Sequence, residues 1–127
     1  SNGTMRFVKG SHLWGKQFHP VRIGLGKIVE EAEDFDGLAP DIDGHPDDHE
    51  ILSWNLSPGD CFAFHGKMLH AAFANSTGHK RRRALSLRLT GNDIVWHLNS
   101  YAPTERDQPN LLQGGPITCD EYPEIWP

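Results

Sequence analysis

Two side chains of this sequence could together bind a metal ion and a diacid that chelates it. His70 begins a short apolar stretch, and the small residues Ala71 and Ala72 follow it and leave room for a bulky group. Arg82 comes twelve residues later, at the start of another partly apolar segment. A neutral imidazole is a common metal ligand, and a planar guanidinium binds a carboxylate through two parallel hydrogen bonds. This pair is the arrangement that a metal-chelating dicarboxylate requires.

Both residues also have simpler explanations. A histidine on a core-facing strand must be hydrogen-bonded or metal-bound to avoid a desolvation penalty. His65, like His70, borders an apolar segment next to the Gly66-Lys67 break. The basic run that includes Arg82 could be a solvated edge that discourages aggregation between strands, and composition alone favours this explanation. Another histidine, His12, follows Gly10 and Ser11 in a turn, where we expect it to make structural hydrogen bonds.

Charge and composition limit the classes of partner. The 127 residues carry a formal net charge of −5, whereas nucleic acid and anionic membranes call for a concentrated basic surface, so we expect neither as a partner. No apolar stretch approaches the roughly 20 residues of a membrane span, and no signal peptide opens the chain. Two cysteines cannot form a disulfide framework, which favours a reducing, cytoplasmic location.

The elements that must position these side chains are expected to be short strands with Gly and Pro turns between them, which is typical of an all-β sandwich or barrel. We expect one domain over 1–127, interrupted by a long acidic loop at about 18–49 and ending in a turn-rich tail at about 101–127. Within the loop, 30–34 could form one or two helical turns. The strands are expected at 5–8, 50–56, 61–65, 68–74, 82–89 and 94–97.

The segment 82–89 has the clearest strand pattern, because polar or small residues alternate with leucines along it. Leu85, Leu87 and Leu89 fall on one side of such a strand. An exposed row of leucines would be unfavourable, so we expect other polypeptide to cover it.

Three blocks of the sequence, in order, resemble the phytanoyl-CoA dioxygenase family. The first is Asn2-Gly3 followed by Gly10-Ser11-His12, and the second runs from Trp54-Asn55-Leu56-Ser57-Pro58-Gly59-Asp60 to His70. The third comprises Asn75-Ser76-Thr77 and Arg82-Arg83-Ala84-Leu85-Ser86-Leu87-Arg88. The ending Pro123-Glu124-Ile125-Trp126-Pro127 is also similar to that of bacterial members. Three blocks in the right order are far more specific than any one of them.

The resemblance implies a double-stranded β-helix (a cupin-like jelly roll) that binds Fe(II) through two histidines and one carboxylate. It implies 2-oxoglutarate as cosubstrate, O2 as oxidant and hydroxylation of a small organic substrate, with halogenation left open. His70 matches the family's last iron ligand. Arg82 matches the arginine that binds 2-oxoglutarate, with Arg88 as the second candidate. No further catalytic residue is implied.

The family's other two iron ligands form a His-x-Asp pair upstream of the Asn-Gly segment. His45-Pro46-Asp47 has this pattern, but it lies in the acidic loop and only 23 residues before His70. That interval holds about two strands at 8–12 residues each, whereas the resemblance requires about four. We therefore expect 45–47 to be solvated loop rather than the iron pair.

The sequence is thus similar to the C-terminal part of a larger oxygenase, incomplete at its N-terminus. We expect the missing N-terminal part, or a second copy, to be needed to complete the fold, and the isolated chain to be inactive. The alternative is a non-catalytic jelly-roll binding module that has lost the His-x-Asp pair.

Overall fold

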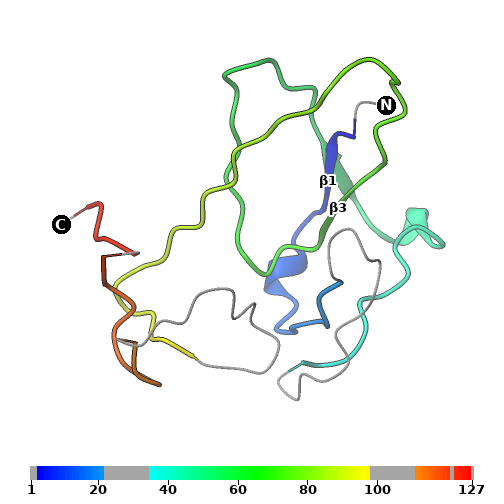
Figure 1. Ribbon diagram of the computed structural model, residues 1–127. Coiled ribbons are helices and arrows are strands. Elements are labelled where there is room, and N and C mark those ends of the chain that lie inside the picture. Colours follow the sequence, from blue (N-terminus) through cyan, green and yellow to red (C-terminus); the bar gives the residue numbers. More distant parts are fainter. Residues whose placement is uncertain (1–2, 22–34, 98–110, 121, 127) are drawn as a thin grey trace.

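The computed structural model describes residues 3–21, 35–97, 111–120 and 122–126. It contains the strands β1 (Met5–Val8), β2 (Ile51–Ser53) and β3 (His70–Ala72) and the short 3-10 helices η1 (Ser11–Leu13) and η2 (Pro46–Asp48) (Figure 1). Helical turns expected at 30–34 lie outside the described residues, as does the tail up to residue 110. Among the described residues, no helix is long and apolar enough to cross a membrane.

The three strands form one antiparallel sheet in the order β2-β1-β3. Phe7 of β1 lies opposite Leu52 of β2 and opposite His70 of β3. Because side chains alternate along a strand, these three side chains share one face of the sheet, and Arg6 belongs to the other face. β3 pairs with β1 although β2 comes between them in the chain. Residues 54–69 must therefore leave the sheet after β2 and return along the opposite edge of β1.

The core of the described structure gathers around Phe7. Phe7 and Val8 are the buried hydrophobic residues, with 3% and 5% of their surface exposed. Aromatic rings surround that of Phe7, at centroid distances of 4.8 Å for Phe64, 5.1 Å for Phe62 and 6.0 Å for Trp54. Two of these rings come from 61–65, so this segment packs onto the Phe7 face of the sheet even though it makes no strand there.

A buried serine joins the end of β1 to the chain entering β3. The hydroxyl of Ser11, 2% exposed, accepts a hydrogen bond from the Leu69 N–H at 2.9 Å and lies 3.3 Å from the Met68 sulfur. The Val8 N–H also donates to the Leu69 carbonyl at 3.0 Å. Sequence analysis assigned the structural hydrogen bonds of this turn to His12, but the buried Nδ1 of His12 has no partner among the described residues. Ser11 takes that role instead, because its short side chain reaches the backbone.

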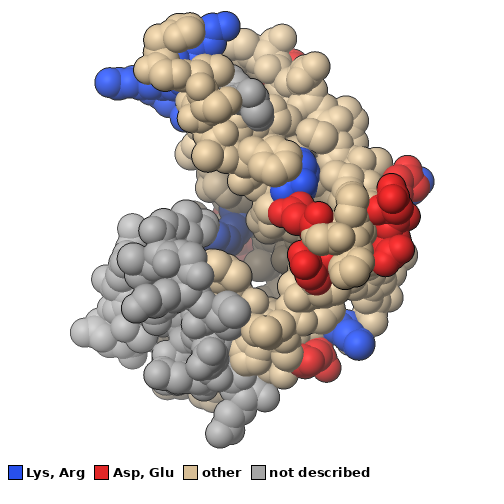
Figure 2. All heavy atoms as spheres, turned by 90° about the vertical axis from the view of Figure 1, so that its right-hand side faces the viewer, with Lys and Arg blue, Asp and Glu red and all other residues tan. Residues whose placement is uncertain are grey.

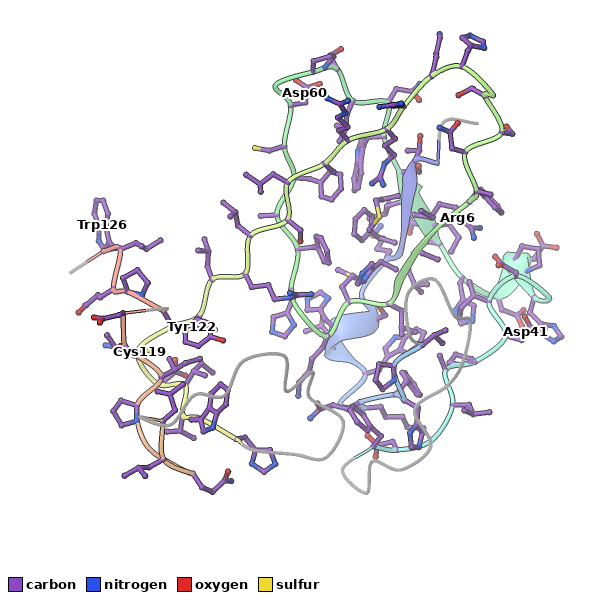
Figure 3. All side chains as sticks on the ribbon, in the orientation of Figure 1. Arg6, Asp41, Asp60, Cys119, Tyr122 and Trp126 are labelled. Carbon is purple, nitrogen blue, oxygen red and sulfur yellow. The ribbon has the colours of Figure 1, made fainter. Side chains whose placement is uncertain are left out.

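The described end of the acidic loop packs on the face of the sheet opposite Phe7. Both terminal nitrogens of Arg6 donate to the Asp43 carboxylate, at 3.0 and 3.4 Å, and the guanidinium carbon lies 3.7 Å from the centre of the Phe73 ring. Lys9 donates to both oxygens of Glu50 at 2.9 and 2.8 Å. Figure 3 shows Arg6 on the strand and Asp41 on the loop beside it, and Figure 2 shows the acidic side chains gathered on this side of the molecule.

Three expected strands do not form. The segments 61–65 and 82–89 make no strand, and 94–97 makes only an isolated bridge between Val95 and Pro116. A strand needs a neighbour that pairs with its N–H and C=O groups, and the described residues supply none for 61–65 and 82–89. In Figure 1 the segment after residue 80 runs away from the sheet. The described residues are mostly non-helical and contain one antiparallel sheet of three short strands, which is consistent with a β-rich fold.

Exposed apolar surface accompanies these missing strands. Leu85, Leu87 and Leu89 are 86%, 73% and 72% exposed. The accessible surface of the chain is 11,011 Å², whereas a compact monomer of this size exposes about 6,800 Å². The chain in this conformation thus leaves uncovered several thousand Å² that a compact fold would bury.

Substituting Ser11 with alanine should destabilise the sheet, because it leaves the part-buried Leu69 N–H without its acceptor. An unsatisfied buried donor costs about 1–3 kcal/mol. We expect a decrease of that size in the free energy of unfolding measured by urea denaturation, together with loss of hydrogen-exchange protection at Leu69. Ser53→Ala is the control, because the Ser53 hydroxyl donates to the Met5 carbonyl at an exposed site. Equal effects of the two substitutions would contradict the role of Ser11.

Candidate functional site

His70 is held in the tautomer that suits a metal ligand. Its Nδ1 lies 2.8 Å from the Met68 carbonyl oxygen. A carbonyl only accepts hydrogen bonds, so Nδ1 carries the proton and the lone pair of the neutral ring is on Nε2. Metal-binding histidines in proteins commonly donate their second ring nitrogen to a backbone carbonyl in this way.

Aromatic rings flank the His70 imidazole. The Phe64 ring lies 4.9 Å from it in an edge-on arrangement, and the Phe7 ring lies 6.0 Å away. His70 itself is exposed, so the ring has aromatic neighbours and an accessible surface. An accessible Nε2 beside apolar rings can accept a ligand while part of its surroundings is kept dry.

His65 has the opposite arrangement. Its Nδ1 accepts a hydrogen bond from the Lys67 N–H at 3.1 Å, so in the neutral ring the proton is on Nε2. The His65 ring pairs with that of His12 at 5.5 Å. The sequence could not distinguish His65 from His70 as a metal ligand, since both border the same Gly-Lys break. The hydrogen bonds favour His70.

Arg82 lies over the start of β1, at a position that a glycine makes possible. Gly3 is buried with φ of 77°, and a Cβ atom placed on it would lie 3.0 Å from the Phe73 carbonyl oxygen and 3.7 Å from Cδ of Arg82. A side chain at residue 3 would meet both the backbone and the stem of the arginine, in a backbone conformation that favours glycine. The Asn-Gly motif was part of the family resemblance, but its contact with Arg82 was not expected.

A closed turn sets where the Arg82 segment begins. The Asn75 carboxamide accepts from the Thr77 N–H at 3.0 Å and from the Thr77 hydroxyl at 2.6 Å, and it donates to the Lys80 carbonyl at 2.6 Å. Asparagine suits this role because its side chain can satisfy backbone groups of its own turn. Asn75 and Thr77 are therefore positioning residues that sequence reasoning missed. The signal was present in the Asn-Ser-Thr triplet.

The structure describes the predicted site residues in separate places. A cavity of about 180 Å³ is lined by His70 together with Phe7, Ile42 and Asp43, among others, and a hollow lined by Arg82 shares no residue with it. That His70 and Arg82 face one cavity stays a prediction. Arg88 is exposed on the segment that leaves the sheet.

The described residues do not bring a set of metal ligands together. Over 3–21, 35–97, 111–120 and 122–126, no three His, Cys, Asp or Glu side chains are grouped so as to hold a metal ion. His45 precedes η2 and Asp47 lies within it, both exposed. The tautomer of His70 fits a metal ligand, and its binding of iron stays a prediction.

Comparison with known proteins identifies the family of the chain. Residues 1–84 match the family described as Phytanoyl-CoA dioxygenase (PhyH), which is about two thirds of the chain. The chain belongs to this family, as the three sequence blocks predicted. The matched region contains β1, β2, β3 and both His70 and Arg82.

Two fungal enzymes are similar to the chain. It is 30% identical over 93 residues to "Multifunctional dioxygenase prhA" of Penicillium brasilianum and 31% identical over 97 residues to "Multifunctional dioxygenase ausE" of the same organism. Each match covers 73% of this chain and 25% of the relative, so the chain spans about a quarter of the length of these proteins. No solved structure matches the chain significantly. Together with the family match, these relatives support an oxygenase-type function.

The two histidines should differ in tautomer when their rings are neutral. We expect long-range ¹H–¹⁵N correlation spectra to show the proton of His70 on Nδ1, because the Met68 carbonyl accepts it, and that of His65 on Nε2. His65 is an internal control because it lies in the same chain segment. The same tautomer in both rings, or protonated Nε2 in His70, would contradict His70 as the preorganised ligand.

Proposed function

We propose that this chain forms the C-terminal part of a jelly-roll oxygenase that uses Fe(II) and 2-oxoglutarate to hydroxylate a small organic substrate. The observation that carries the proposal is the hydrogen bond between His70 Nδ1 and the Met68 carbonyl, in a chain that belongs to this family. The hydrogen bond leaves Nε2 available on the face of the sheet where the aromatic rings lie. Sequence position alone made His70 a candidate, and this hydrogen bond gives it the chemistry of a ligand.

The strand order supports a jelly roll. β3 returns beside β1 after an excursion in which Phe62 and Phe64 pack onto the Phe7 face. A chain that leaves one sheet, passes across its inner face and returns to the first sheet is what a two-sheet sandwich requires. In this proposal β1, β2 and β3 belong to one sheet, and the segments 61–65 and 82–89 belong to the facing sheet.

Further polypeptide would complete the fold. The segments 61–65 and 82–89 lack strand partners among the described residues, and the leucines of the second segment are exposed. The chain also exposes more surface than a compact monomer of its size. We propose that an N-terminal part pairs with these segments and brings the remaining two iron ligands. A second copy is the other way to cover them.

Each residue that this chain contributes to the proposed site would have one task. His70 would hold iron through Nε2, with the Met68 carbonyl fixing the ring, and Arg82 would bind the far carboxylate of 2-oxoglutarate through its two-pronged guanidinium. Phe7 and Phe64 would keep water from one side of the imidazole. The iron and the keto acid, when bound, supply the oxidising chemistry with O2. Gly3 and Asn75 would act through the position of Arg82.

Replacing Arg82 by alanine should weaken 2-oxoglutarate binding by a few kcal/mol, since a charge-assisted two-bond contact is lost. Calorimetric titration with 2-oxoglutarate in the presence of Fe(II) measures this, using the chain joined to the N-terminal part that completes it. Arg88→Ala is the matched control. If Arg88→Ala or Arg81→Ala causes the loss instead, the assignment of Arg82 is wrong.

The isolated 127-residue chain should bind Fe(II) weakly and should not turn over 2-oxoglutarate, because one imidazole is too few ligands. The measurement is Fe(II)-dependent release of CO2 from 2-oxoglutarate by the purified chain, with His70→Ala as the comparison. Decarboxylation by the isolated chain that is lost in His70→Ala would show that the chain needs no further polypeptide. A binding module without the iron pair would not respond to the keto acid even when completed.

A further inference from the structure

The closed turn at 75–80 and the basic run that follows it surround a hollow in the surface. The residues that line it are polar or cationic: Asn75, Thr77, Gly78, His79, Lys80, Arg81, Arg82 and Arg83. Four of the eight carry a positive charge, and no acidic residue lines the hollow. This is unexpected in a chain with a net charge of −5. The cavity that His70 borders is lined by one arginine and one aspartate, so the hollow is the more basic of these two sites.

No carboxylate in the described part of the chain neutralises this run. The ion pairs found there join Arg6 to Asp43 and Lys9 to Glu50. Asp60, which lies toward the same end of the molecule in Figure 3, accepts from the Ser57 N–H at 2.8 Å within its own turn. In Figure 2 most of the acidic side chains lie at mid-height and below and one lies near the top, whereas Lys and Arg side chains lie both at the upper end and beside the acidic ones. The four cations therefore face solvent rather than an internal partner.

The charge exceeds what the cosubstrate needs. One guanidinium binds one carboxylate through two parallel hydrogen bonds, and Arg82 meets that requirement in the proposed function. Lys80, Arg81 and Arg83 remain. The turn below them is closed by the Asn75 and Thr77 hydrogen bonds, so the run begins from a fixed backbone position. A compact ligand with more than one negative charge matches this surplus better than a single carboxylate does.

We propose that the hollow at 75–83 binds the phosphate or diphosphate group of a small molecule. Guanidinium forks match the oxygen geometry of phosphate, and lysine adds a point charge. The basic surface spans only four consecutive residues, and the chain as a whole repels polyanions, so a compact phosphate group fits better than nucleic acid or an anionic membrane. The hollow needs neither iron nor His70, so this site can exist even if the proposed oxygenase function fails.

Calorimetric titration of the 127-residue chain with inorganic pyrophosphate at low ionic strength tests this site. The double variant Arg81→Gln and Arg83→Gln should bind pyrophosphate at least about tenfold more weakly, as expected for losing charge-assisted hydrogen bonds. The matched control is Lys16→Gln with Lys67→Gln, which removes the same charge from exposed positions outside the hollow. The control variant should bind pyrophosphate like the original chain.

Several results would overturn the proposal. They are no pyrophosphate binding, equal weakening in both double variants, or binding to a DNA duplex or to vesicles containing phosphatidylserine without binding to pyrophosphate. A second titration, with 2-oxoglutarate and the completed protein, separates this site from the cosubstrate site. The Arg81 and Arg83 double variant should keep 2-oxoglutarate binding, which Arg82→Ala loses. If that double variant loses it as well, the whole basic run serves the cosubstrate and the phosphate site is wrong.

Discussion

The pairing of Phe7 with His70 across β1 and β3 is the constraint on which the candidate site depends. Phe7 is buried among aromatic rings, so β1 cannot turn over without exposing it. A shift of β3 by one residue would place Ala71 opposite Phe7 and send the imidazole to the other face of the sheet. The bonds of Leu69 to Ser11 and Val8 hold this register just before β3 begins.

The two faces of the sheet have separate tasks. Phe7 and His70 share the face on which the aromatic rings gather, and Arg6 anchors the acidic loop on the other. The described part of the loop, 35–49, is therefore anchored through Asp43 on the face opposite Phe7, and its residues Ile42 and Asp43 also line the cavity that His70 borders. Charges of opposite sign also lie on different segments. Several acidic side chains lie on the loop, and the basic hollow lies beside the turn at 75–80. One short sheet can thus support an imidazole site on one face while its other face stabilises the loop.

Sequence alone was sufficient for the family and for the three strands near Phe7, because these depend on local alternation and on recognisable blocks, whereas the role of His70 stays a prediction. The patterns of 61–65 and 82–89 predicted strands that do not form, since a strand depends on a neighbour as much as on its own pattern. Sequence reasoning also missed Ser11, Gly3 and Asn75. Their roles depend on contacts with residues distant in the sequence or on the exact closure of a turn, and residue type does not reveal these.

The two halves of the proposed site depend on different parts of the fold. His70 is oriented by its own strand and by the Met68 carbonyl, so its tautomer is set within the described sheet. Arg82 is placed by Gly3 and by the turn closed through Asn75, and it begins a segment that lacks a strand partner in the described structure. Pairing that segment with a further strand would fix the direction of the guanidinium but would leave the tautomer of His70 unchanged. Completing the fold should therefore affect cosubstrate binding by Arg82 more than the tautomer of His70, because only the segment of Arg82 still lacks a strand partner.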